Sequence, residues 1–84
     1  MIKNTDAVQA AKKYAAELFS DASVVRLEEI ELDEMNKTWL VTVSLRRSLP
    51  VMGYNPFGED QLDLKVVRVD AQTGEVVSVK NRAA

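Results

Sequence analysis

Acidic side chains are concentrated in one stretch, and these are the residues whose type could support chemistry. Glu28, Glu29, Glu31, Asp33 and Glu34 lie close together, and carboxylate oxygens are the ligands that Ca²⁺ and Mg²⁺ prefer. The stretch has neither EF-hand spacing nor a glycine. In an extended strand, alternation would place Glu29, Glu31 and Asp33 on one face but spread along it. We interpret this stretch as a solvated strand face, and predict no metal site and no cofactor.

Histidine and cysteine are both absent from the 84 residues. Their absence removes the commonest general base and the strongest common nucleophile, and it excludes a disulfide framework or a thiolate metal site. Catalysis would have to rest on carboxylates, lysine, tyrosine or serine. We therefore predict that the protein is not an enzyme and has no catalytic residues.

The charge balance limits the classes of partner. The net charge is −2, from 13 acidic and 11 basic residues, which argues against general binding to nucleic acid or to an anionic membrane. Several basic residues could line up as a stripe on the C-terminal strands: Arg46, Arg47, Lys65, Arg68, Lys80 and Arg82. We favour cross-strand pairing of these bases with nearby acids, namely Glu28, Glu29, Glu31, Asp63 and Glu75.

The N-terminal residues have no apolar signal core, and no apolar run approaches the length of a membrane span. The sequence therefore predicts a soluble, cytoplasmic protein with no nucleic-acid or membrane partner.

The stretch from Arg47 to Asp60 contains both prolines and two of the three glycines, which predicts a loop. Loops this long are uncommon in compact domains and tend to bind partners or to be disordered. This one carries apolar residues where polar ones are expected: Leu49, Val51, Met52, Tyr54 and Phe57. We predict that these five residues contact a partner protein. The alternative is a loop that folds back over the open edge of the core.

A helix over residues 5–20 is predicted by apolar residues at helical spacing, with Asp6 and Gln9 in the form of a capping box. The apolar residues are Val8, Ala11, Ala15, Leu18 and Phe19.

Four strands are predicted after the helix, over residues 24–32, 38–46, 61–69 and 75–80. The first needs a β-bulge near Glu28 and Glu29, because its apolar residues change parity there. Trp39 begins the apolar face of the second strand and is interpreted as a core residue. The last two strands form a hairpin joined over residues 70–74, with Gly74 where a positive φ is commonly needed.

The order of these elements predicts one α+β domain spanning residues 1–84. An N-terminal helix packs on one face of a four-stranded antiparallel sheet with α-β-β-β-β meander topology. The opposite face of the sheet is left uncovered. Val66–Val67 and Val76–Val77 place at least one apolar residue on each face.

The closing hairpin reads Val69-Asp70-Ala71-Gln72-Thr73-Gly74-Glu75-Val76 and resembles the final hairpin of the PepSY family, V-D-x-x-T-G-E-V. The alanine-rich helix and the strand around residues 39–43 also look like this group of small bacterial domains. The resemblance implies a cystatin-like helix-on-sheet unit, used for protein contact or for restraining peptidases.

We therefore expect a small non-enzymatic interaction module, regulatory or inhibitory, that binds a partner protein through residues 47–60, with the open sheet face as a second candidate surface. The alternative is a structural subunit that forms a homodimer through the open face or an edge strand.

Overall fold

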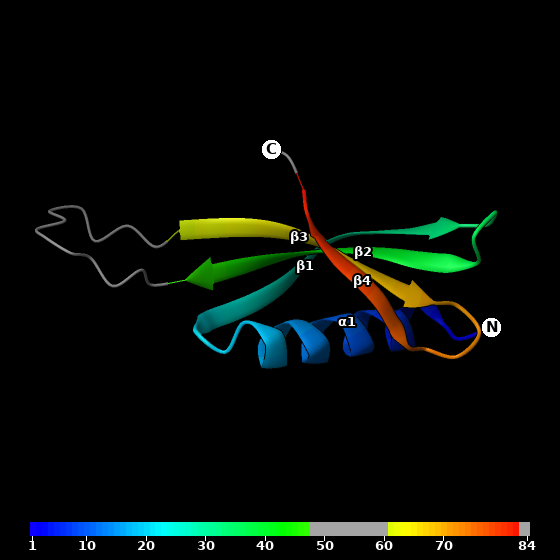
Figure 1. Ribbon diagram of the computed structural model, residues 1–84, viewed down its shortest axis with the longest axis horizontal. Helices are drawn as coiled ribbons and strands as arrows, with labels where there is room; N and C mark the ends of the chain where they lie inside the picture. Colours follow the sequence, from blue (N-terminus) through cyan, green and yellow to red (C-terminus); the bar gives the residue numbers. More distant parts are fainter. Residues whose placement is uncertain (48–60, 83–84) are drawn as a thin grey trace, which may run out of the picture.

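One helix and one antiparallel sheet make up the fold (Figure 1). The structure, a computed structural model, describes residues 1–47 and 61–82. The elements are α1 (Asn4–Leu18), β1 (Ala22–Asp33), β2 (Thr38–Arg47), β3 (Gln61–Asp70) and β4 (Val76–Asn81). The strands lie side by side in chain order, β1-β2-β3-β4, with every neighbouring pair antiparallel. The predicted α+β fold, a helix on a four-stranded meander, is confirmed.

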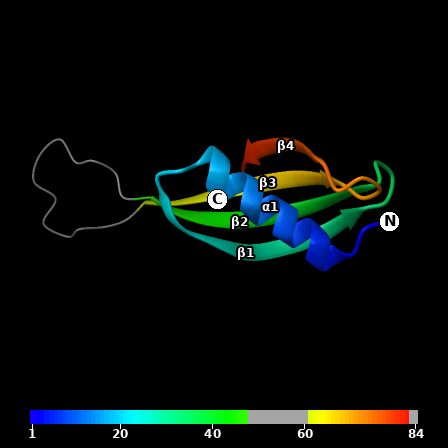
Figure 2. The same ribbon diagram turned by 90° about the horizontal axis from the view of Figure 1, so that it is seen from below.

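Small side chains let α1 lie close to the sheet, across one of its faces (Figure 2). Ala7, Ala11 and Ala15 are fully buried, and their spacing of four residues places them on one side of the helix. Leu18 was predicted on this buried side but is 53% exposed. The reason is that α1 ends at Leu18, and Phe19, the next residue, packs against the core instead.

The start of α1 differs from the predicted capping box. Lys3 occupies the cap position, and the Asp6 carboxylate accepts a hydrogen bond from the Lys3 backbone N–H at 3.3 Å. Asp6 therefore acts from within the first turn and not as the cap. The chain is fixed just before the helix, because the Ile2 N–H donates to the Ala71 carbonyl oxygen at 2.6 Å.

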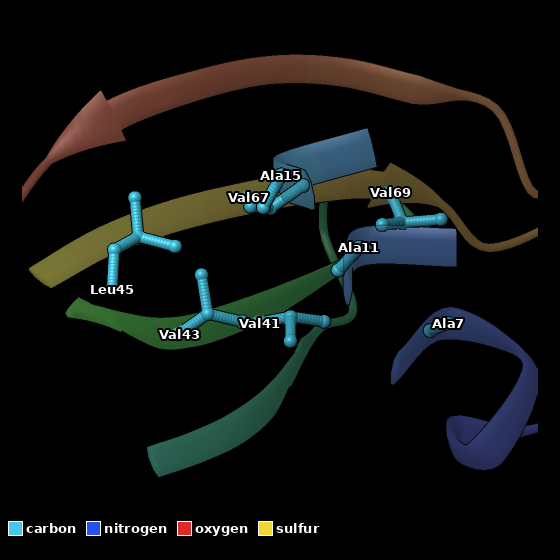
Figure 3. Close-up of a cluster of buried hydrophobic side chains, with 8 residues drawn as sticks. All are labelled: Ala7, Ala11, Ala15, Val41, Val43, Leu45, Val67 and Val69. Atoms are coloured by element: carbon cyan, nitrogen blue, oxygen red, sulfur yellow. The ribbon is translucent and has the colours of Figure 1, made fainter. Parts of the chain in front are cut away.

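The core lies between α1 and the two central strands. The helix alanines face the fully buried side chains of β2 and β3 (Figure 3). Those side chains are Val41, Val43, Leu45, Val67 and Val69. Trp39 is partly buried and packs against this cluster, as predicted for a core residue.

The predicted β-bulge in β1 is confirmed. Leu27 lies opposite Val43 and Glu29 lies opposite Thr42, so Glu28 is the extra residue on the bulged strand. The bulge shifts the parity of the strand by one residue, which returns Ile30 to the helix side, opposite Val41. Apolar residues of β1 on both sides of the bulge therefore lie on the same face of the sheet, the face covered by α1.

Candidate interaction surface

The face of the sheet opposite α1 is covered by no other described element; we call it the open face. Its central strand, β2, contributes small polar residues in alternation with the buried valines. Larger apolar residues of β3 lie beside them in the register. From β2 and β3 the open face receives Thr38, Leu40, Thr42, Ser44, Arg46, Leu62, Leu64, Val66, Arg68 and Asp70. Leu62 is 60% exposed, so this face offers apolar surface to another molecule.

The centre of the open face is hollowed and polar. Thr42 is 5% exposed and Ser44 is 2% exposed, although no helix lies over them. Long side chains of neighbouring strands reach across these short residues. The Ser44 hydroxyl donates to Glu28 Oε1 at 3.1 Å, and Arg82 Nη1 donates to Thr42 Oγ1 at 3.4 Å.

One ion pair crosses the open face from the end of β4 to β1. Arg82 Nη1 lies 2.5 Å from Glu29 Oε2, and the Arg82 backbone N–H donates to the Leu64 carbonyl oxygen at 3.0 Å. In Figure 1 the C-terminal end of β4 rises on the side of the sheet away from α1. Arg82 is therefore placed over the strands that it contacts.

Two shallow hollows follow from this arrangement. The first is lined by Glu29, Glu31, Leu40, Thr42, Val66 and Arg82. The second is lined by Val24, Arg26, Glu28, Ser44, Arg46 and Leu62. Each combines a short polar residue of β2 at its floor with leucine or valine and charged side chains at its rim. Such a surface can bury apolar side chains of a partner while its rim forms hydrogen bonds and ion pairs.

The predicted contact residues Leu49, Val51, Met52, Tyr54 and Phe57 lie outside the described residues. Their role in binding a partner stays a prediction from the sequence.

One basic residue of the C-terminal strands lies on the opposite face of the sheet from Arg68, Lys80 and Arg82. Lys65 lies on the helix side of β3, where its Nζ is 5.1 Å from the centre of the Phe19 ring and donates to the Asn81 side chain. Arg82 pairs with Glu29, one of the cross-strand pairings that were favoured. Within residues 1–47 and 61–82, no three acidic side chains gather in a way that could hold a metal ion.

Another depression lies at the end of the sheet where β1 meets β2. It is lined by Met1, Leu32, Glu34, Lys37, Ala71 and Gln72. Its charged side chains, Glu34 and Lys37, are both exposed to solvent. This depression offers weaker support for a site than the open face does.

Thr42 and Ser44 were not recognised from the sequence as part of a site. Their signal was present, because two short polar residues alternate with Val41, Val43 and Leu45 on the central strand. The alternation indicated only that both side chains lie on the face of β2 away from the core.

Among the described residues, no helix is both long and apolar enough to cross a membrane. Comparisons with models of known protein families, with curated proteins and with solved structures find no match.

Proposed function

We propose that the protein is a non-enzymatic interaction module, regulatory or inhibitory, that binds another protein chain through the open face of its sheet. The observation that carries this proposal is the hollowed centre of that face, where Thr42 and Ser44 form a floor with apolar residues of β3 on one side and charged residues of β1 on the other. A flat, uniformly polar face would offer little to a partner beyond weak surface contacts.

The chemistry of the open face suits a protein ligand better than a small molecule. The hollows are shallow, and their apolar side chains are spaced along a strand, so a ligand must be extended to reach several of them. The apolar residues at the rim, above all Leu62, supply the buried area that drives association. The charged rim, with Glu31 and Arg68 beside Leu40, supplies specificity.

Photo-crosslinking in the native cell tests the proposal. Benzoylphenylalanine at Leu62 on the open face should give a discrete crosslinked product, whereas the same residue at Tyr14 should not. Tyr14 is a matched control because it is also exposed but lies on α1, away from the open face. Equal products from both positions, or a product from position 14 alone, would contradict the proposal.

A further inference from the structure

The charges of the open face are distributed unevenly across the sheet. On β1, one base and four acids lie on this face: Arg26, Glu28, Glu29, Glu31 and Asp33. On β3, on β4 and directly after β4, three bases accompany one acid: Arg68, Lys80, Arg82 and Asp70. The Asp70 carboxylate already accepts hydrogen bonds from the backbone of its own turn. One lateral edge of the open face is therefore acidic and the other is basic.

This pattern is complementary to itself under one particular symmetry. A two-fold axis parallel to the strands, running between two facing sheets and midway between β2 and β3, places the β1 edge of one copy opposite the β4 edge of the other. An axis perpendicular to the strands would place β1 opposite β1, so acids would face acids. Opposite charges meet only in the first arrangement, and like charges brought together at an interface oppose association.

We infer that the occupant of the open face is a second copy of this chain, packed face to face about a two-fold axis parallel to the strands. This inference rests on the proposed function and names its partner. Two sheets packed in this way keep their strands nearly aligned. Lys80 of one copy then lies opposite Glu29 of the other, and Glu31 is two residues further along β1, on the same face. Among the described residues neither Glu31 nor Lys80 has an ion-pair partner, and both are exposed.

The size of the face indicates a reversible dimer. Strands spaced about 4.8 Å apart, with about nine residues at ~3.4 Å each, outline a face of roughly 15 by 30 Å. Stable interfaces bury about 800 Å² of accessible surface on each partner, more than the flat area of this face. Leu62, Leu64 and Val66 supply the apolar contact, and the charged edges select the orientation.

Charge reversal with mixing tests the inference. Sedimentation velocity over a wide concentration range should show wild-type protein passing from monomer to dimer. Glu31→Lys and Lys80→Glu should each raise the dissociation constant about tenfold or more, because the two-fold axis applies each substitution twice and makes the edges alike in sign. An equimolar mixture of the two variants should regain the wild-type dissociation constant, because each lysine then meets a glutamate.

Matched controls are Glu17→Lys and Lys13→Glu, which reverse the same charges on exposed positions of α1 and should leave the dimer unchanged. Circular dichroism should show that all four variants are folded.

Three results would overturn the inference: a monomer at every concentration, a dimer insensitive to both open-face reversals, or two weakened variants that do not recover on mixing. If the protein is a monomer but still crosslinks to a different protein from position 62, a second copy is excluded as the partner. The proposed function is then supported.

Discussion

Asp70 organises the loop of the final hairpin with a single side chain. Its Oδ1 accepts backbone hydrogen bonds from Gln72 at 2.7 Å and Thr73 at 3.0 Å, and its carbonyl oxygen accepts one from Gly74 at 2.9 Å. Gly74 has a φ of +79°, a conformation that costs glycine little. The hydrogen bond from Thr73, followed by that from Gln72, lowers the pKa of the Asp70 carboxyl below its ordinary value.

The lowered pKa of Asp70 predicts a pH-dependent loss of stability. A carboxyl whose pKa is lower in the folded state stabilises the protein above its unfolded pKa, and this stabilisation is lost as the pH falls through the folded pKa. Urea unfolding should show wild type more stable than Asp70→Asn at pH 7, with the difference shrinking below about pH 4. A difference that is unchanged at pH 2.5 would show that the charge of Asp70 has no part in it.

At the scale of elements, the fit of α1 against the sheet depends on side chains of minimal size. Ala7, Ala11 and Ala15 face buried valines with no accessible surface left between them. The helix therefore lies as close to the sheet as its backbone permits, and a larger side chain on this side must push the two layers apart.

We expect Ala11→Leu to lower the free energy of unfolding by about 1–3 kcal/mol through overpacking. Ala16→Leu is the matched control, because Ala16 is on the exposed side of the same helix and should change stability by less than about 0.5 kcal/mol. Urea unfolding of the two variants measures both values. Equal effects would mean that helix propensity, and not the contact with the sheet, decides the outcome.

The elements were predictable because their signals are local. Alternation on β2, the change of parity at Glu28 and the glycine of the final loop each restrict the backbone within a few residues. The role of Lys3 as the cap of α1 was not predictable in this way. Just before this cap, the Ile2 N–H donates to the Ala71 carbonyl oxygen, a contact between residues far apart in the sequence.

The open face was only partly predictable for the same reason. Topology required one uncovered face, and the valine pairs Val66–Val67 and Val76–Val77 were expected to place at least one apolar residue on each face. The hollow at Thr42 and Ser44 depends on Glu28 and Arg82 reaching across neighbouring strands. Such a placement follows from register and sheet twist and not from local pattern.

At the scale of the whole molecule, α1 covers one face of the sheet, and no other element of the described residues covers the second face. The free energy falls when a partner removes the apolar residues of that face from water. Under the proposal, the acidic β1 edge and the basic β3–β4 edge select the partner and its orientation. Under the proposed function, the face covered by α1 stabilises the fold and the open face binds the partner.

The most direct test of this account is a map of photo-crosslinking yields in the native cell, from open-face positions Leu40, Leu62, Leu64 and Val66 and from α1 positions Lys13, Tyr14, Ala16 and Glu17. We predict products from the open-face set and none from the helix set, whether the partner is a second copy or another protein. Products confined to the helix set, or spread equally over both, would contradict the claim that the open face is the binding surface.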